Sequence, residues 1–379
     1  MQPSTERILT THTGSLPRSP ALQALLREQD ERRLGDTSAL EPALRDAVAD
    51  VVRRQVECGL DIVSDGEQGR AMYAAYVKER LTGFDGKRRL RQERRNLGDG
   101  DFPDFVVPHQ TSAMIPQPAC TGPVAWKDPE SIHRDIARLR AAAPPGTTLF
   151  MTSASPGVVA HFLPNEHYPT REAYLEALAD AMRQEYRAIL DAGIVLQVDS
   201  PDLAMTRVSE FAHLSLAEFK RVVALHVDVL NHALAGLPPE RMRLHLCWGN
   251  YEGPHHHDVP IREILNEVLR ARPAGLSFEG ANPRHAHEWK VWRDVKLPDG
   301  KVLIPGVIDT TTTFVEHPEL VAERIERYSE VVGRARVIAG TDCGFGTSAW
   351  GRKVPASIVW AKLRSLVEGA QLASASVRA

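Results

Sequence analysis

The sequence has few cysteines and lacks any long apolar run, and both shortages narrow the class of protein. Four cysteines among 379 residues are too few for a disulfide-stapled secreted fold. No apolar stretch approaches the roughly 18 residues that span a bilayer. The first residues, Met1 to Arg7, also lack the apolar segment of a signal peptide. We therefore expect a cytoplasmic protein with reduced thiols and no membrane partner.

The chain also lacks a strong excess of charge of either sign. Its formal net charge is −3, and 43% of its residues are hydrophobic and 25% charged. This is the composition of an ordinary globular protein, and it gives no electrostatic reason to expect nucleic acid as a partner. At this length the chain could form one large α/β barrel or two smaller domains.

Helical and strand patterns alternate along the chain. The clearest helix is predicted after Thr170, an N-cap residue, and ends at Gly193. Short apolar runs between such helices are predicted as strands. The predicted strands are Ile8–His12, Asp61–Ser64, Thr148–Thr152, Ile194–Asp199, Met242–Cys247, Ala274–Glu279, Val302–Ile308 and Val337–Thr341.

Eight strands alternating with helices favour a (β/α)8 barrel (a TIM barrel) over an open doubly wound sheet with a small second domain. No Gly-x-Gly-x-x-Gly turn follows the first strand, which weakens the dinucleotide-binding alternative. We expect a single barrel domain over residues 1–379. The segment from about 82 to 123, with its basic run Lys87–Arg95, is interpreted as an insertion after the second strand that covers the barrel mouth.

Metal-ligating side chains stand where predicted strands end. His245 and Cys247 close one run two residues apart, so their side chains point to the same face. Glu279 closes the next run, and Cys343 follows the last. The carboxyl ends of barrel strands are where sites are built, and His, Cys and Glu suit a catalytic zinc ion. The sequence thus predicts a Zn²⁺ site, with a closed structural zinc site as the alternative.

Other strand ends carry polar residues suited to a small substrate. Backbone N–H groups near Gly14 and Ser15 suit an anion. Glu67 and Asp199 are candidates to bind an ammonium, and N-capping or turn chemistry is the alternative for both. The triplet His255–His257 is interpreted as a loop lining the mouth that could contribute a metal ligand.

The segments at these strand ends resemble the C-terminal catalytic barrel of cobalamin-independent methionine synthase. They occur in the same order over nearly the whole chain, and the likeness is greatest to the shorter single-barrel branch, which includes epoxyalkane:coenzyme M transferases. The matching segments are Thr10–Pro17, Asp65–Glu67, Gln197–Asp199, His245–Cys247, Phe278–Glu279 and Asp342–Gly344. Trp248–Pro254 and Ala281–Trp289 are typical of that branch.

The resemblance implies that His245, Cys247, Glu279 and Cys343 bind zinc. It also implies that Ser15, Glu67 and Asp199 hold the amino-acid end of homocysteine. Two departures stand out: Ser200 replaces a family acid, and Thr311 stands in the stretch where the family has its proton-donating His. We take His12, His255 and His256 as candidates for that proton.

The predicted function is zinc-dependent alkyl transfer, most simply methyl transfer, to a small thiol such as homocysteine. Coordination to a dication deprotonates a thiol, which can then attack an electrophilic carbon. The alternative is opening of an epoxide by coenzyme M, whose sulfonate would call on Arg18 and Arg70. A third class is a binding or regulatory protein on a retired enzyme scaffold. The expected partners are a small thiol and an alkyl donor, and the sequence is compatible with a homo-oligomer.

Overall fold

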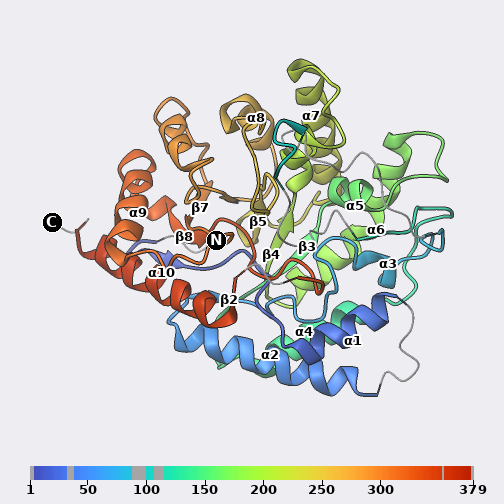
Figure 1. Ribbon diagram of the computed structural model, residues 1–379, viewed down its shortest axis with the longest axis horizontal. Coiled ribbons are helices and arrows are strands. Elements are labelled where there is room, and N and C mark those ends of the chain that lie inside the picture. Colours follow the sequence, from blue (N-terminus) through green and yellow to red (C-terminus); the bar gives the residue numbers. More distant parts are fainter. Residues whose placement is uncertain (1–3, 32–37, 88–99, 106–114, 352–353, 377–379) are drawn as a thin grey trace.

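The computed structural model describes residues 4–31, 38–87, 100–105, 115–351 and 354–376. Its centre is a sheet of eight parallel strands surrounded by helices (Figure 1), with neighbours in the order β1-β8-β7-β6-β5-β4-β3-β2. The predicted (β/α)8 barrel is confirmed. The strands are β1 (Leu9–Thr10), β2 (Ile62–Val63), β3 (Thr148–Ala154), β4 (Val195–Asp199), β5 (Met242–His245), β6 (Gly275–Phe278), β7 (Val302–Ile308) and β8 (Ile338–Thr341).

The barrel closes at a seam between β1 and β2. The Asp61 N–H donates to the Thr10 carbonyl over 3.2 Å, and the Asp61 carboxylate accepts the Thr10 N–H at 2.8 Å. A side chain thus satisfies a backbone donor that a regular ladder would pair with a carbonyl. Both strands are short because this carboxylate replaces part of the ladder.

The helices cover the outside of the barrel. In α6, the Thr170 side chain accepts the Ala173 N–H at 3.1 Å, and the helix buries an apolar face that includes Leu175, Leu178 and Met182. The helices are α1 (Pro20–Asp30), α2 (Leu40–Glu57), α3 (Val77–Arg80), α4 (Glu130–Ala142), α5 (Pro156–Phe162), α6 (Arg171–Asp191), α7 (Leu216–Ala233), α8 (Ile261–Val268), α9 (Pro318–Val332) and α10 (Ala356–Ser376).

Three helices, α1, α3 and α5, were not among the sequence predictions. Of these, α1 and α5 each begin with a Ser-Pro pair, in which the Ser side chain caps the helix and Pro lies in its first turn. Helix α3 has only four residues, and α5 is buried along its whole length. A very short or fully buried helix shows little amphipathic periodicity, which is the signal that the longer helices provide.

A layer of polar side chains crosses the barrel interior beneath the strand ends. The Arg243 guanidinium of β5 lies 3.7 Å from the centre of the Phe150 ring. It donates to Gln197 Oε1 at 2.7 Å and to the His12 carbonyl at 2.8 Å. Burial lowers the pKa of Arg243 to about 9. This layer separates the apolar lower core from the site above it.

The segment predicted as an insertion leaves and rejoins the barrel at neighbouring points. Leu81 forms an antiparallel bridge with Trp126, and the Thr82 N–H donates to the Ala125 carbonyl at 2.7 Å. Residues 88–99, with most of the predicted basic run, and residues 106–114 lie outside the described residues. The insertion's role as a cover remains a prediction.

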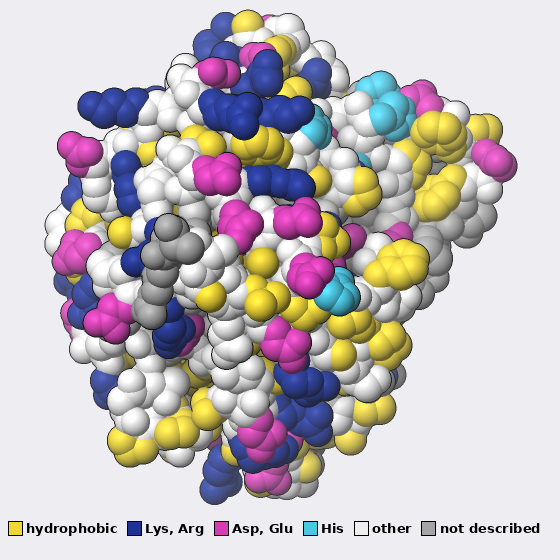
Figure 2. Space-filling view, turned by 90° about the vertical axis from the view of Figure 1, so that its left-hand side faces the viewer, with side chains coloured by type: hydrophobic (Ala, Val, Ile, Leu, Met, Phe, Trp, Pro, Cys, Tyr) yellow, Lys and Arg dark blue, Asp and Glu magenta, His cyan; other side chains and the backbone are white. Residues whose placement is uncertain are grey.

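The molecular surface mixes charges of both signs. On the face in Figure 2, Lys and Arg side chains alternate with Asp and Glu. None of the helices that the structure describes is long and apolar enough to cross a membrane.

Candidate metal centre and active site

Three predicted ligands come together at the carboxyl end of the barrel. The donor atoms of His245, Cys247 and Cys343 all lie within 4.8 Å of one another, and all three residues are buried. The Leu246 N–H still donates to the Ser277 carbonyl at 2.8 Å. The chain therefore stays extended past the end of β5, so the side chains at 245 and 247 share a face.

The geometry of this cluster fits a zinc ion. The Cys247 and Cys343 sulfurs are 3.7 Å apart, close to the separation of about 3.8 Å that two thiolates have around tetrahedral zinc. His245 Nε2 is buried without a hydrogen-bond partner among the described residues. A buried, unpaired imidazole nitrogen beside two thiols is costly unless it binds something. The donor set, one nitrogen and two sulfurs, is one that zinc favours.

The electrostatics of the cluster favour one thiolate. The hydrogen bond from Cys247 outweighs burial and lowers the pKa of Cys343 to about 5, with help from His245. The same bond raises the pKa of the Cys247 thiol well above its usual value. Burial opposes a charge on His245, but Cys343, Asp199 and Glu279 together raise its pKa. The cluster therefore favours a thiolate at Cys343, and a bound cation would stabilise that negative charge.

Glu279, the fourth predicted ligand, lies beside the cluster but faces other partners. Its Oε1 accepts the Trp248 N–H at 2.9 Å. Its Oε2 accepts from Asn282 Nδ2 at 2.7 Å and from Arg284 at 2.6 Å. The structure therefore unites three of the four predicted ligands and holds the fourth in hydrogen bonds close by.

Asp342 fastens the loop after β8 to the loop after β6. Its carboxylate accepts backbone N–H groups from Gly280 and Ala281, each at 2.8 Å, and from Asn282 at 2.9 Å. A side chain at Gly306 would collide with Asp342, so glycine is needed there. This anchor sets the positions of Cys343 and Glu279 relative to each other.

Two predicted substrate-binding acids lie next to the centre. Burial raises the pKa of Glu67 to about 7, with a contribution from Asp199. Burial likewise raises the pKa of Asp199 to about 6. Glu67 Oε1 accepts from Thr152 Oγ1 at 3.0 Å, and Oε2 has no partner among the described residues. A buried acid pair with an unpaired oxygen suits a bound cation.

The backbone around Glu67 has an unusual conformation. Glu67 has a φ of 54°, a left-handed conformation that costs a non-glycine residue free energy and is typical of functional sites. Gly14 lies against it, because a Cβ there would come within 2.7 Å of Glu67 Oε1. Ser15 Oγ accepts the Gly346 N–H at 3.3 Å. The first loop is thereby fixed against both Glu67 and the Cys343 loop.

Arg18 and Arg70 are buried and already engaged. Arg18 donates to the carbonyls of Glu67 and Gly346. Arg70 donates to Thr152 Oγ1 at 2.7 Å and to the Thr152 carbonyl. Both guanidiniums also face Glu67 electrostatically. They support the acid pair and hold the loops around it.

Each of the three candidate proton donors already has a hydrogen-bond partner. His12 Nε2 pairs with Gln55 Oε1 at 2.7 Å and its Nδ1 accepts the Gly14 N–H, while burial lowers its pKa to about 3. His255 is buried beside the Cys247 loop and pairs with Asp258 at 2.8 Å. His256 is exposed and pairs with Asp101, so the structure does not bring it to the centre.

Two residues of the site were missed by the sequence reasoning. Thr152 contacts both Glu67 and Arg70, and it closes a predicted strand, so the strand-end criterion could have found it. Tyr73 is the other: burial and the charges of Cys247 and Cys343 raise its pKa well above the usual value. Tyr73 lies in the loop after the predicted strand Asp61–Ser64 but well past its end, so the strand-end criterion did not select it.

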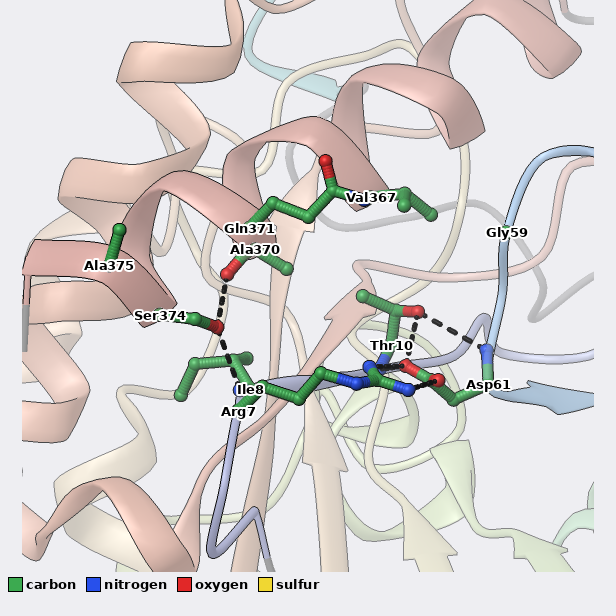
Figure 3. Close-up of a pocket in the computed structure, with 10 residues that line it drawn as sticks. All are labelled: Arg7, Ile8, Thr10, Gly59, Asp61, Val367, Ala370, Gln371, Ser374 and Ala375. Atoms are coloured by element: carbon green, nitrogen blue, oxygen red, sulfur yellow. Dashed lines mark hydrogen bonds and ion pairs between the residues drawn. The ribbon is translucent and has the colours of Figure 1, made fainter. Parts of the chain in front are cut away.

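A separate cavity of about 400 Å³ opens at the opposite end of the barrel, between β1, β2 and α10 (Figure 3). Four of its polar side chains have partners in the cavity wall: Arg7 pairs with Asp61, Asp61 with Thr10, and Ser374 Oγ accepts the Ile8 N–H at 2.9 Å. Barrel sites form at the carboxyl ends of strands, so this cavity lies at the end away from the candidate centre.

Fold and site together define a class: a (β/α)8 barrel with a buried thiol–imidazole centre beside a pair of acids at its mouth. A sequence model of the family "Cobalamin-independent synthase, Catalytic domain" matches residues 8–90. That match covers the loops with Ser15 and Glu67.

Relatives extend this likeness over the chain. A methionine synthase of Sulfolobus acidocaldarius is 26% identical over 95% of this chain and 90% of its own length. One from Methanothermobacter marburgensis is 27% identical over 96% and 99%. A solved B12-independent methionine synthase from a Shewanella species, in complex with selenomethionine, superposes with a TM-score of 0.74 at 21% identity over 98% of this chain and 99% of that one. The resemblance to the cobalamin-independent methionine synthase family is confirmed.

Proposed function

We propose that this protein is an enzyme that transfers a methyl group to the sulfur of homocysteine, with a zinc ion held by His245, Cys247 and Cys343. The observation that carries the proposal is the convergence of these three buried donors within 4.8 Å, beside the buried acids Glu67 and Asp199. The methionine synthases that are 26% and 27% identical to this chain support the same reaction.

Zinc, when bound, supplies the positive charge that keeps a thiol deprotonated at neutral pH. Residues of the chain itself would position the substrate. Glu67 and Asp199 would bind the substrate ammonium, with Gln197 Nε2 holding Asp199 Oδ1 at 2.7 Å. Buried, prearranged acids fix the amino-acid end, so the substrate sulfur is presented in one orientation.

In this proposal, the hydrogen-bond partners of Glu279 limit when its carboxylate is available to a metal ion. Arg284 counters the burial of Glu279 and keeps its pKa low, and with Asn282 and Trp248 it satisfies both carboxylate oxygens. We propose that Glu279 would be the fourth zinc ligand, and a displaceable one, because its carboxylate has these other partners close by. His255 is retained as the candidate proton donor because it lies beside the loop that bears Cys247.

The alternative acceptor, coenzyme M, has less support. Its sulfonate would need free cationic donors, whereas Arg18 and Arg70 donate to carbonyls and Thr152. The buried acids would also repel an anion. We keep as a further proposal that the chain forms one catalytic domain, with residues 82–123 inserted near its mouth.

Calorimetric titration of the zinc-loaded protein with homocysteine and with coenzyme M tests the proposal. We expect homocysteine to bind and release a proton near neutral pH, and Glu67→Gln to weaken that binding. Binding of coenzyme M without binding of homocysteine would contradict the proposal. A methyl-transfer assay with several donor classes then identifies the donor.

A further inference from the structure

The histidine triplet after β5 is divided between the interior and the surface. His255 is buried and pairs with Asp258. The side chains of His256 and His257 are 42% and 39% exposed and point outward. The function proposed above uses neither of these two exposed histidines at the centre.

Both exposed histidines meet a carboxylate from a distant part of the chain. Asp101 Oδ2 lies 2.8 Å from His256 Nε2 and 2.6 Å from His257 Nε2. The two imidazole rings are 4.2 Å apart, and the Phe102 ring packs edge-on against His256 at 5.2 Å. The donor atoms of Asp101, His256 and His257 all lie within 4.8 Å of one another.

We propose that Asp101, His256 and His257 form a second, surface site for a divalent metal ion of the zinc type, which fastens the segment around Asp101 to the loop between β5 and α8. Two imidazoles and one carboxylate suit Zn²⁺, Co²⁺, Ni²⁺ or Cu²⁺ better than Mg²⁺ or Ca²⁺. Because the site is exposed, water completes the coordination shell.

The observed spacing needs only a small adjustment to accept an ion. Nitrogen and oxygen ligands at about 2.1 Å around tetrahedral zinc are separated by about 3.4 Å. The present separations of 2.8 and 2.6 Å require an outward movement of the Asp101 carboxylate of under an ångström. The ion takes the place of the hydrogens now shared between imidazole and carboxylate, so binding releases protons.

The position of the site gives the ion a structural effect. The loop that carries His256 and His257 begins directly after Cys247, and the neighbouring Asp258 pairs with His255 and His285. Joining this loop to the segment around Asp101 restrains one wall of the barrel mouth. The surface site itself contains no thiol and does not depend on the central site.

Zinc stoichiometry after equilibration in a zinc buffer, measured by elemental analysis, tests this inference. We expect two equivalents in the wild-type protein and one in the double variant His256→Asn/His257→Asn. The double variant Cys247→Ser/Cys343→Ser should also bind one equivalent, at the surface. His232→Asn is the matched control, because His232 is an exposed histidine paired with a single aspartate, Asp180, at 3.0 Å; it should keep two.

Cobalt and hydrogen exchange distinguish the sites without any assay of activity. Co²⁺ bound to thiolates gives strong charge-transfer absorption, so the second equivalent should add none. Zinc should slow amide exchange in residues 100–105 and 248–258 of the wild type and of the cysteine variant. Loss of all zinc from the cysteine variant, an unchanged zinc stoichiometry in the histidine variant, or a surface equivalent without protection (an adventitious ion only) would overturn the inference.

Discussion

The two ends of the barrel differ in whether their buried polar groups have hydrogen-bond partners. At the carboxyl end, Glu67 Oε2, Ser200 Oγ and His245 Nε2 are buried without hydrogen-bond partners among the described residues. At the amino end, Asp61 accepts from Thr10 N and Oγ1 and pairs with Arg7, although a sizeable cavity opens there (Figure 3).

This difference distinguishes the amino-end cavity from the candidate ligand-binding site at the carboxyl end. An unpaired buried polar group costs about 1–3 kcal/mol of stability, so several of them in one place need a compensating ligand. No polar side-chain atom of the residues that line the amino-end cavity is buried without a partner, so that cavity carries no such cost. We therefore take unpaired buried polar atoms, and not empty volume, as the mark of the proposed functional end of this barrel.

The largest expected effect comes from removing a central sulfur. Cys247→Ser or Cys343→Ser should lose bound zinc and at least about 100-fold in activity, since even outer-shell changes cost metal sites 10–100-fold. Elemental analysis and methyl-transfer assays measure both. Cys58→Ser is the control, a buried cysteine at the end of α2 that should keep zinc. Full zinc content in both central variants would refute the assignment.

Removing a charge from the acid pair Glu67 and Asp199 should have the second-largest effect. Glu67→Gln should weaken homocysteine binding by about 10–100-fold, because hydrogen bonds to charged groups contribute about 1.5–3 kcal/mol. Zinc content should be unchanged. Calorimetry on the zinc-loaded protein measures the affinity. An unchanged affinity would remove Glu67 from the substrate site.

A change of pH should alter ligand affinity through the same acid pair, by a smaller amount. Asp199 and Glu67 must be ionised to bind an ammonium, and their pKa values lie near 6 and 7. The affinity for norleucine, an amino acid without a thiol, should rise as pH increases through this range. An affinity that is flat, or highest at acidic pH, would contradict this assignment.

The stability of the unliganded protein should change in the opposite direction. A carboxyl whose folded-state pKa is raised contributes stability that is present below its unfolded pKa and is lost as pH rises through the folded value. For Glu67 that loss, on the order of 1–3 kcal/mol, falls between about pH 4.5 and 7. Thermal unfolding of Glu67→Gln should be less sensitive to pH in this range than that of the wild type.

The smallest effect should come from the amino end. Asp61→Asn weakens the charge-assisted bonds to Thr10 and Arg7 and should cost about 1 kcal/mol of unfolding free energy, measured by urea denaturation. Zinc content and homocysteine affinity should stay at wild-type values. A drop in either would show that the two ends are coupled through the barrel.

Much of the fold could be predicted from the sequence because parallel strands are buried on both faces and appear as apolar runs. Each of the eight predicted runs overlaps a barrel strand, and β3 extends two residues beyond its run, to Ala154. The lengths of β1 and β2 were overestimated, because Asp61 replaces ladder partners at the seam, and a side-chain contact across 51 residues leaves no local pattern.

The strand-end criterion also predicted most of the site. It placed His245, Cys247 and Cys343 together because the carboxyl ends of parallel strands meet at one mouth. It could not find Tyr73, which lies in the loop after β2 but well past the strand end, between β2 and α3. It also could not place Arg284 against Glu279, since a salt bridge five residues apart depends on how the loop folds back.

The sequence by itself determined the barrel, the number of its strands and the kinds of donor at its mouth, because hydrophobic period and strand-end position are local properties. Only the tertiary structure decided which atoms lack partners and that Asp199 sits close enough to raise the pKa of Glu67. It also decided which histidine of the triplet faces inward and which two meet Asp101. Those outcomes depend on contacts between residues tens to hundreds of positions apart, and such contacts exist only once the barrel has closed.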